Sequence, residues 1–576
     1  MKRSMIDPDE ALRRTLDLAA RPTSEFVTLD DALGRFLGAD IHTPWDLPAH
    51  DNSAMDGYAI RAADTADATG VHPVRLTIVG SVFAGTRPTA IVGPGQAVRI
   101  MTGAVIPAGA DTVVRQEATR AGEGVVDVRI ASDRGNNVRP RGETLRRDEL
   151  VLRVGTKVTS QEIALLAAFG RCQVPVARRP TVHVVTCGDE LHDAHEAADD
   201  LTVDSNGPMI AAMAREAGAI AYRSGPVKDD LEQLRAHLLQ VLSTVDVLIT
   251  IGGASVGERD LVVDALRAHG AELVFHTVAL KPGKPVGLFI LREKPVFVLP
   301  GNPAACSMTF DRLVRPFLLA VQGVPREQVS RPRLPAILAN DVHKQPGLTY
   351  YLRGWAELAL GGLQVRLPPR QSSGQLTAGL EGNAVAIIPA GPGTVFAGTP
   401  VEIELLKPPH VAPRPPILAF AGYSGSGKTT ALTALISRLS ARGVRVAALK
   451  HDAHEFQLDR KGKDTAKFSA AGAIAVGIAS ASRRAVIATT SRATTLAELI
   501  ATITVEVDVI LVEGYKHDDI PKIVVHSDGI RELSPRGPGV LAVISDSACG
   551  VAVPVFSHGD DEALEAFVLS FIRRSV

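Results

Sequence analysis

The chain has little cysteine. Its 576 residues contain four cysteines, which are Cys172, Cys187, Cys306 and Cys549. They lie far apart and lack the short spacings of zinc ligands, which argues against a disulfide framework and against a structural zinc site. Such sparse cysteine fits a reducing compartment, so we expect a cytoplasmic location.

The chain also lacks long hydrophobic runs, and its net charge is close to zero. No stretch approaches the roughly 18 uninterrupted apolar residues that a membrane-spanning helix needs. The formal net charge is -1, which removes bulk electrostatic attraction to nucleic acids or anionic membranes. We therefore expect neither a nucleic acid nor a membrane among the partners.

The N-terminus carries acidic residues where a signal peptide would need apolar ones. Asp7 suits a helix N-cap, Pro8 suits the first helical position, and Glu10 is placed to close a capping box. These residues predict a helix that begins at Pro8.

Two kinds of hydrophobic pattern follow along the chain, whose 45% hydrophobic content is ample for globular folding. Short β-branched runs separated by Gly and Pro predict a small β domain. Apolar strands that alternate with helices then predict a mostly parallel sheet covered on both faces. The β-type runs are 74–80, 96–103, 111–117 and 125–130, and the alternating strands are 181–186, 245–250 and 294–300.

A proline-rich segment, 407–416, holds five prolines in ten residues and predicts a stiff, extended linker. Short strands precede it, and a second alternation of strands and helices follows it. We therefore expect an α/β multidomain protein, at about 150 residues per domain. The expected segments are an elongated N-terminal helical/β subdomain (1–50 and 143–179), a small β subdomain (51–142), a central doubly wound α/β domain (180–329), a β-barrel-like domain (330–407), the linker (408–416) and a C-terminal P-loop α/β domain (417–576).

Polar and glycine-rich residues follow the strands of the central domain. In an open parallel sheet, ligands bind beyond the carboxyl ends of the strands. Gly252, Gly253 and Gly257 permit a nest of backbone N–H groups that binds anions. Glu190 and Asp260 are suited to hold a hard divalent cation against phosphate oxygens.

A lysine loop, Lys281-Pro-Gly-Lys284-Pro, lies in the same domain. Its prolines stiffen the loop, and two neighbouring ammonium groups favour an oxyanion between them. Each feature alone also fits an ordinary turn or a helix cap. Because acids and lysines converge on one edge of the sheet, we favour a Mg²⁺-dependent site for a phosphorylated, anionic substrate.

A series of motifs in residues 1–407 resembles the molybdopterin molybdenumtransferases, the family of bacterial MoeA and the gephyrin E domain. The resemblance implies a homodimer and a site where two subunits meet. It also implies that molybdate is inserted into adenylylated molybdopterin with release of AMP. The motifs are DNSAMDGYA (51–59), RIMTG (99–103), RPRGE (139–143), TCGDEL (186–191), GGASVGERD (252–260), KPGKP (281–285) and LPGNPAA (299–305).

The resemblance also implies roles for single residues. Asp56 and Thr102 would reach the site from the small β subdomain. Mg²⁺ and the pyrophosphate would be organised by Glu190, by Asp230 or its neighbour Asp229, and by Asp260. The implied molybdate ligands are Lys281, Lys284, Arg353 and Ser373, and Gly252, Gly253 and Ser255 would bind substrate.

Three positions depart from the family pattern. Thr277 stands where a lysine is common, Cys187 replaces a threonine, and Gly374 replaces a histidine after Ser373. Of the two acids in DNSAMDG, we favour Asp56 for the site and a turn role for Asp51. The mixed-charge segment 134–147 fits a solvated hinge, with Glu143 in a structural role.

The strongest single motif follows the linker. Gly422-Tyr-Ser-Gly425-Ser-Gly427-Lys428-Thr429 fits the P-loop pattern G-x4-G-K-[ST], between an apolar strand and a helix. The loop N–H groups would hold phosphates, Lys428 would reach the terminal ones, and Thr429 would coordinate Mg²⁺. Thr430, the next residue, is also expected at the nucleotide.

A second magnesium ligand should come from a neighbouring apolar strand, and Glu513 in VDVILVEGY is placed for this role. No N-K-x-D string is present. The residues therefore indicate a nucleoside triphosphate without naming its base.

The C-terminal segment resembles MobB, the GTP-binding adapter in formation of molybdopterin guanine dinucleotide. The similar strings are GYSGSGKTT, ALKHDAHEFQLDRKGKDTAKFSAAGA (448–473) and LVEGYK (511–516). The resemblance implies GTP as ligand, possible weak GTPase activity and a molybdenum cofactor guanylyltransferase as partner. His451 and His454 have a spacing that also suits a metal, although loop histidines are more often plain surface, and Lys463 and Asp464 are nucleotide-loop candidates.

We favour an enzyme fused to an adapter. The fusion would raise the effective concentration of the cofactor at its next handler, and comparing guanylated-cofactor yield from the chain with that from an equimolar mixture of its halves tests this idea. The alternatives are a cofactor-binding scaffold without turnover and a C-terminal small-molecule kinase.

Overall fold

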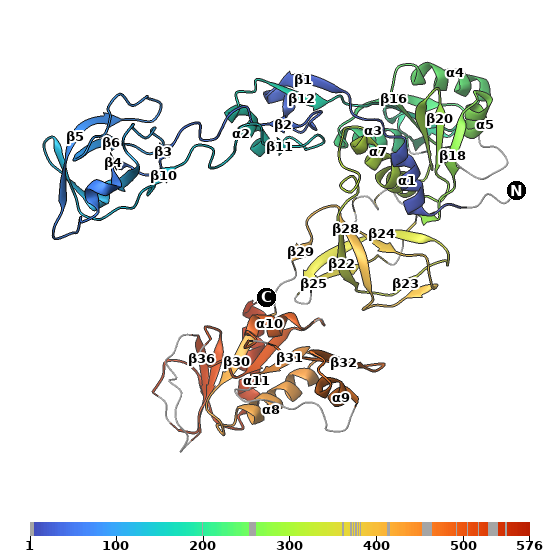
Figure 1. Cartoon of the computed structure of the whole chain (residues 1–576). Coiled ribbons are helices and arrows are strands. Elements are labelled where there is room, and N and C mark those ends of the chain that lie inside the picture. The colour runs from blue at the N-terminus through green and yellow to red at the C-terminus, as the bar shows by residue number, and fades with distance from the viewer. Residues whose placement is uncertain are drawn as a thin grey trace. The chain divides into compact units, whose positions relative to one another are not determined.

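The computed structural model describes two compact units, Met1–Arg331 and Pro332–Val576 (Figure 1). Within the residues that it describes, no helix is long and apolar enough to cross a membrane. The described residues are 5–198, 200–252, 261–359, 362–368, 371–372, 374, 377, 380, 382–411, 415–451, 464–490, 492–503, 505–516, 518–527, 539–547 and 550–575.

The first helix, α1 (Pro8–Asp17), begins at the predicted residue. Asp7 is its N-cap and accepts a hydrogen bond from the Asp9 backbone N–H at 2.8 Å. The predicted capping box is wrong, because Glu10 bonds the guanidinium groups of Arg13 and Arg14 instead. Those two ion pairs lower the pKa of Glu10 to about 2.

The segments on either side of the small β domain pair with each other. Strand β1 (Ser24–Thr28) runs antiparallel to β12 (Gln173–Ala177), and β2 (Ile41–His42) runs antiparallel to β11 (Leu150–Leu152). Helix α2 (Ser160–Ala168) begins with a capping box between Thr159 and Glu162. Buried side chains from both segments, including Leu37, Leu166 and Val174, form one core, so two distant stretches fold together.

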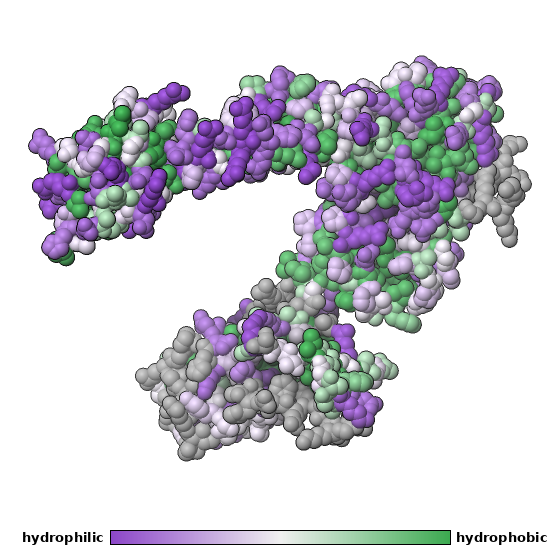
Figure 2. Space-filling view, in the orientation of Figure 1, coloured by the Kyte–Doolittle hydropathy of each residue, from purple (hydrophilic) through white to green (hydrophobic). Residues whose placement is uncertain are grey.

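The small β domain is a six-stranded sheet in the order β7-β4-β6-β5-β9-β8. It has two buried clusters, which contain Leu76 and Val126 in one case and Val98 and Ile100 in the other. On the face shown in Figure 2, apolar side chains reach its surface among hydrophilic ones. The strands are β4 (Gly57–Ile60), β5 (Val74–Val82), β6 (Gln96–Ile100), β7 (Thr112–Arg115), β8 (Thr119–Ala121) and β9 (Val125–Val128), and a separate pair joins β3 (Asn52–Ser53) to β10 (Val138–Arg139).

The central domain contains a six-stranded sheet in the order β16-β13-β17-β21-β20-β18. The first four strands are parallel, and β20 and β18 are antiparallel to their neighbours. The strands are β13 (Thr181–Cys187), β16 (Ile220–Val227), β17 (Val247–Ile251), β18 (Glu272–His276), β20 (Gly287–Leu291) and β21 (Lys294–Leu299); outside this sheet lie β14 (Leu191–His192), β15 (Thr202–Val203) and β19 (Leu280–Lys281).

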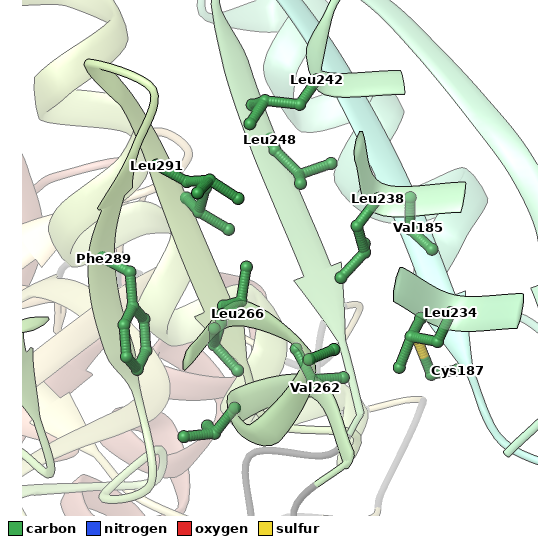
Figure 3. Close-up of a cluster of buried hydrophobic side chains, with 14 of the residues drawn as sticks. Val185, Cys187, Leu234, Leu238, Leu242, Leu248, Val262, Leu266, Phe289 and Leu291 are labelled. Atoms are coloured by element: carbon green, nitrogen blue, oxygen red, sulfur yellow. The ribbon is translucent and has the colours of Figure 1, made fainter. Parts of the chain in front are cut away.

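Apolar side chains bury both faces of this sheet. Leu234 and Leu238 of helix α4 and Leu266 of α5 pack against Leu248 and Phe289 on one face (Figure 3). Val184, Ile249 and Phe297 alternate along their strands with Val185, Leu248 and Val296 of this cluster and are also fully buried, which places them on the other face. The helices are α3 (Asn206–Glu216), α4 (Leu231–Leu242), α5 (Leu261–Ala268), α6 (Pro303–Thr309) and α7 (Arg315–Ala320).

The second unit begins with a closed five-stranded barrel. Its order is β24-β25-β22-β28-β26, and pairing of β26 with β24 closes the ring. The barrel strands are β22 (Arg333–Leu338), β24 (Thr349–Ala359), β25 (Gly362–Arg366), β26 (Ala384–Ile388) and β28 (Pro400–Leu405); β23 (Val342–His343) pairs with β27 (Thr394–Val395), and β29 (His410–Val411) pairs with β24.

The P-loop domain has an entirely parallel six-stranded sheet, in the order β31-β34-β30-β35-β36-β37. Leu432 of α8 and Leu564 of α11 cover one face, and Leu496 and Ile500 of α10 cover the other. The elements are β30 (Ile417–Ala421), α8 (Lys428–Ala441), β31 (Val446–Lys450), α9 (Asp464–Ala470), α10 (Leu496–Ala501), β34 (Val509–Glu513), β35 (Lys522–Val525), β36 (Val540–Ile544), β37 (Val555–Phe556) and α11 (Asp561–Ser575), with a separate hairpin of β32 (Ala475–Ala479) and β33 (Arg484–Ala488).

The predicted mixed α/β content and the predicted barrel are confirmed. The segment boundaries and the arrangement of the segments stay predictions.

Candidate functional sites

Three neighbouring parallel strands of the central domain end at one edge of its sheet. Strand β17 lies between β13 and β21. Glu190 therefore follows one strand end, Gly252 the next and Gly301 the third. We call this edge the strand-end rim. The carboxyl edge of a parallel sheet is where such folds bind ligands.

Gly252 is fixed at the rim by its backbone. Its φ is +93°, and a Cβ at this position would lie 2.6 Å from the carbonyl oxygen of Cys187. Its N–H donates to the carbonyl oxygen of Leu299 at 3.2 Å. The glycine thus joins the ends of all three strands. Gly253, Ser255, Gly257 and Asp260 lie outside the described residues.

The acids beside the rim have different surroundings. Glu190 is exposed. Asp230 is the N-cap of α4, where its Oδ1 accepts from the Gln233 N–H at 2.8 Å. The neighbouring Asp229 donates its backbone N–H to Asp189 Oδ1 at 3.0 Å, which ties its loop to the end of β13. One oxygen of Asp230 is therefore used in capping, and both acids are exposed.

Two further polar residues stand at the rim. Buried Asp204 accepts from the Thr186 hydroxyl at 2.9 Å and from the Gly207 N–H at 2.8 Å. Asn206 donates its Nδ2 to the carbonyl oxygen of Gly301 at 2.5 Å, and its buried Oδ1 has no hydrogen-bond partner in the described part of the chain. These residues are not among those predicted for the site from the sequence. The signal that marks them is the run of three polar residues, 204–206, at the start of the helix α3.

The lysine loop is anchored on α6, the helix that begins just after the rim residue Gly301. Gly283 has φ +113°, and a Cβ there would lie 2.3 Å from Thr309 Cγ2 on that helix. Lys281 and Lys284 are both exposed. The loop therefore presents two ammonium groups from a tightly packed base.

Thr277, just before the lysine loop, has an unusual environment. Its φ is +90°, it is 5% exposed, and its hydroxyl has no hydrogen-bond partner within the described ranges. A threonine with positive φ is strained. The residue that departs from the family pattern is thus buried beside the loop.

Asp56 and Thr102 are brought together in the small β domain. Oδ1 of Asp56 accepts from both the backbone N–H and the hydroxyl of Thr102, each at 2.7 Å. These hydrogen bonds, the backbone one first, lower the pKa of Asp56. Asp51 instead accepts from the Arg141 N–H at 2.7 Å, which joins two segments 90 residues apart.

Arg353 lies on β24 of the barrel. Gln371 bonds its backbone twice: Gln371 Oε1 accepts from the Arg353 N–H at 3.1 Å, and Gln371 Nε2 donates to the Arg353 carbonyl at 2.9 Å. The segment that leads to Ser373 is therefore tied to the strand of Arg353. Ser373 itself lies outside the described residues.

The P-loop joins β30 to α8, as its motif requires. Gly425 and Gly427 have φ values of +85° and +88°. A Cβ at Gly422 would lie 2.4 Å from the carbonyl oxygen of Val525 on β35, so the loop fits only a glycine there. Lys428 begins α8, and Thr429 and Thr430 follow it as exposed residues.

Lysines crowd the P-loop. Lys428 Nζ donates to the carbonyl oxygen of Tyr423 at 2.7 Å. Burial lowers the pKa of Lys428, and the positive charges of Lys450 and Lys516 lower it further. The carboxylate of Glu513 acts in the opposite direction and raises the pKa. Lys516 lies over the Tyr423 ring at 4.4 Å. Bound phosphate would relieve the repulsion between these ammonium groups.

Thr429 and Glu513 form the pair expected at a magnesium ion. The Thr429 hydroxyl donates to Glu513 Oε2 at 2.9 Å, and Lys450 Nζ is 3.4 Å from Glu513 Oε1. Glu513 ends β34, the strand beside β30. Hydroxyl and carboxylate oxygens are donors that Mg²⁺ prefers.

The remaining candidates offer less. The His451 ring packs on Tyr515 at 4.6 Å, and Asp464 pairs with Lys467 at 3.1 Å. His454 and Lys463 lie outside the described residues. Among the residues that the structure describes, no group of three or more His, Cys, Asp or Glu side chains is arranged to hold a metal.

Comparison with known families divides the chain into four matched regions. Residues 6–170 match the MoeA N-terminal region (domains I and II), 183–320 the probable molybdopterin binding domain, and 335–406 the MoeA C-terminal region (domain IV). Residues 417–546 match molybdopterin guanine dinucleotide synthesis protein B, the MobB family.

Individual proteins agree with these matches. The chain is 34% identical to a molybdopterin molybdenumtransferase of Bacillus subtilis over 413 residues, which is 70% of this chain and 95% of that protein. It is 33% identical to the molybdopterin molybdenumtransferase of Staphylococcus aureus over 407 residues, covering 70% and 97%. A crystal structure of a molybdopterin biosynthesis MoeA protein from Pyrococcus horikosii has a TM-score of 0.62 at 30% identity, covering 70% of this chain and 100% of that one.

The rim, the lysine loop and the barrel therefore lie in the part that carries this likeness, and the P-loop lies in the part that follows it. The chain belongs to the molybdopterin molybdenumtransferase (MoeA) family of molybdenum cofactor biosynthesis and continues into a MobB domain.

Proposed function

We propose that the first part of the chain inserts molybdate into adenylylated molybdopterin. Water would attack the phosphoanhydride bond, so that molybdopterin keeps one phosphate and AMP leaves with the other. The two dithiolene thiols would bind molybdenum in place of two oxide ligands, which take up the thiol protons and two protons from the solvent and leave as water. The observation that carries this proposal is the strand-end rim, where Gly252 joins the ends of β13, β17 and β21 within the molybdopterin-binding region.

Mg²⁺ fits the oxygen donors of this region. Glu190, Asp260, and Asp230 or Asp229 would hold it, and the exposed Glu190 carboxylate favours a hydrated, hard cation. When bound, the ion neutralises phosphate charge.

Molybdate is a tetrahedral dianion, which suits ammonium groups, a guanidinium fork and a hydroxyl. Lys281 and Lys284 would supply the first, Arg353 the second and Ser373 the third. Gly253 and Ser255 would bind the phosphate end of the substrate through backbone N–H groups. Gly252, whose own N–H donates to the Leu299 carbonyl oxygen, would shape the turn that brings them there. Asp56 and Thr102 would complete the site in a homodimer, and their mutual hydrogen bonds keep the carboxylate ionised for that role.

The MobB domain is proposed to bind GTP, with the phosphates on Gly422, Gly425, Gly427, Lys428 and Thr430. Thr429 and Glu513 would hold Mg²⁺ there, which their 2.9 Å contact supports. The molybdenum cofactor guanylyltransferase is the proposed partner of this domain. The fused chain would thereby serve two successive steps of cofactor synthesis.

The experiment is release of AMP from adenylylated molybdopterin by the full chain, with molybdate and Mg²⁺. Wild type should release AMP, and Asp260→Ala should lose about 100-fold or more of the rate, because a charged ligand is removed from the phosphate site. Asp264→Ala is the matched control, since Asp264 lies on α5 and contacts only the exposed Arg267, at 3.9 Å, among its described ion pairs. Equal rates for the two variants would reject the site; no release by wild type would favour a scaffold without turnover.

A further inference from the structure

Three strands beside the P-loop strand carry a second set of polar residues. In the sheet, β35, β36 and β37 follow β30 in that order and are parallel to it. Their carboxyl ends therefore lie at the same edge as the P-loop. Ser527, Asp546 and His558 each come two residues after the end of one of these strands.

These residues form a chain of contacts that ends on the P-loop. Asp546 receives the backbone N–H of His558 at 2.8 Å and faces its Nδ1 at 3.1 Å. His558 Nε2 is 3.3 Å from the Ser426 carbonyl oxygen and 3.3 Å from Ser527 Oγ. The Ser527 hydroxyl donates to the same Ser426 carbonyl at 3.1 Å.

Both ring nitrogens of His558 face acceptors. Nδ1 faces the Asp546 carboxylate, and Nε2 faces the Ser426 carbonyl oxygen. An imidazole N–H donates hydrogen bonds, so the ring is suited to link the carboxylate to the P-loop carbonyl. Ser426 is 1% exposed, which shields its carbonyl from competing water.

A hydrogen bond to the Ser426 carbonyl has a consequence for the next N–H. The peptide bond between Ser426 and Gly427 is planar and trans, so its carbonyl oxygen and its N–H point in opposite directions. Hydrogen bonds that fix the direction of the Ser426 carbonyl oxygen therefore also fix the direction of the Gly427 N–H, which points away from them. The ring also packs close to Gly427, where a Cβ would lie 3.2 Å from His558 Nε2.

We propose that Asp546, His558 and Ser527 are positioning residues that hold the Ser426–Gly427 peptide so that the Gly427 N–H points at the nucleotide phosphates. This inference rests on the proposed nucleotide binding and extends it to residues outside the P-loop motif. Asp546 orients the His558 ring, and that ring and Ser527 hold the Ser426 carbonyl. The carbonyl in turn sets the direction of the Gly427 N–H. These three residues would therefore affect binding of the phosphates and not of the base.

The test uses the full chain with Mg²⁺ and two probes: a fluorescent GTP analogue, and inorganic pyrophosphate as a competitor that lacks base and ribose. His558→Gln and Asp546→Asn should each weaken binding of both probes about tenfold, because each change removes a hydrogen bond with the Asp546 carboxylate, a charged group. The double variant should bind both probes as tightly as the single variant with the lower affinity, because both changes interrupt one chain of contacts.

Two further variants separate positioning from folding. Ser527→Ala should weaken both probes by a smaller factor, about threefold, with an unchanged thermal midpoint, since one neutral hydrogen bond is lost. His526→Gln is the matched control; His526 precedes Ser527, and its ring has no hydrogen bond within the described residues, so both affinities should stay at the wild-type value.

Three results overturn the inference. Unchanged affinities in all variants would show that the contacts do not position the loop. Weaker binding of the GTP analogue with unchanged binding of pyrophosphate would show that Asp546, His558 and Ser527 act on the base or the ribose. Failure of wild type to bind either probe would reject the nucleotide site itself, and the positioning set with it.

Discussion

The strand-end rim and the P-loop both lie at the carboxyl ends of parallel strands in two separate sheets, yet they are built differently. The P-loop gathers its backbone donors, its lysine and its hydroxyl within Gly422–Thr429. The rim draws Glu190, Gly252 and Gly301 from three strands separated by long stretches of sequence. A contiguous motif can supply a nearly complete site by itself, whereas a dispersed one depends on the order of the strands.

The two edges also differ in charge. At the P-loop, Lys428 is close to two further lysines, Lys450 and Lys516, and to one glutamate, which suits an anion. At the rim, acids stand beside a single lysine, Lys228, which donates to the Asp189 carbonyl oxygen at 3.0 Å. The paired lysines of the central domain stand on a separate loop that packs on α6.

The largest effect that distinguishes the P-loop from the strand-end rim should come from removing the P-loop lysine. Lys428→Ala should weaken binding of Mg²⁺-GTP roughly 100-fold, because a charged hydrogen-bond donor to the phosphates is lost. Titration with a fluorescent GTP analogue measures it. Lys467→Ala, which removes an exposed lysine that pairs with Asp464 on α9, is the control. Binding within threefold of wild type for Lys428→Ala would show that this loop is not a phosphate site.

A second change tests whether packing holds the lysine loop. Gly283→Ala should lower the free energy of unfolding by about 1–3 kcal/mol more than Gly270→Ala, because its Cβ would overlap Thr309 whereas Gly270 has open space. Both glycines have positive φ, so the comparison isolates the contact. Urea denaturation of the full chain measures the difference. Equal losses would mean that the loop yields and is not anchored on α6.

The smallest expected effect concerns Asp56. Thr102→Val removes the side-chain donor, so the pKa of Asp56 should rise toward that of an ordinary carboxyl group. A lowered pKa in the folded state stabilises the protein at pH values above the unfolded pKa, and this contribution is lost as pH falls through the folded pKa. The carboxyl titration followed by NMR measures the change, with Thr119→Val as control. An unchanged pKa would show that the backbone hydrogen bond alone sets it.

Much of both sites could be predicted from local patterns. The P-loop, its flanking strand and helix, and Glu513 follow from a contiguous motif and from one apolar strand. The strand ends of the central domain follow from hydrophobic runs bounded by glycine. These features depend on short stretches of chain, which sequence periodicity describes well.

The residues that escaped prediction depend on distant contacts or on competition between partners. Glu10 fits a capping box by spacing, yet the neighbouring guanidinium groups compete for its carboxylate more strongly. His558 reaches the P-loop because β35, β36 and β37 continue the sheet beside β30, an order that no local pattern reveals.

The most direct measurement compares AMP release by wild type, Lys428→Ala and Asp260→Ala in the same full-length chain, with adenylylated molybdopterin, molybdate and Mg²⁺. If the rim and the P-loop are separate chemical centres, wild type and Lys428→Ala should release AMP at similar rates, and Asp260→Ala should release almost none. Loss of AMP release in Lys428→Ala, or full activity in Asp260→Ala, would contradict the account.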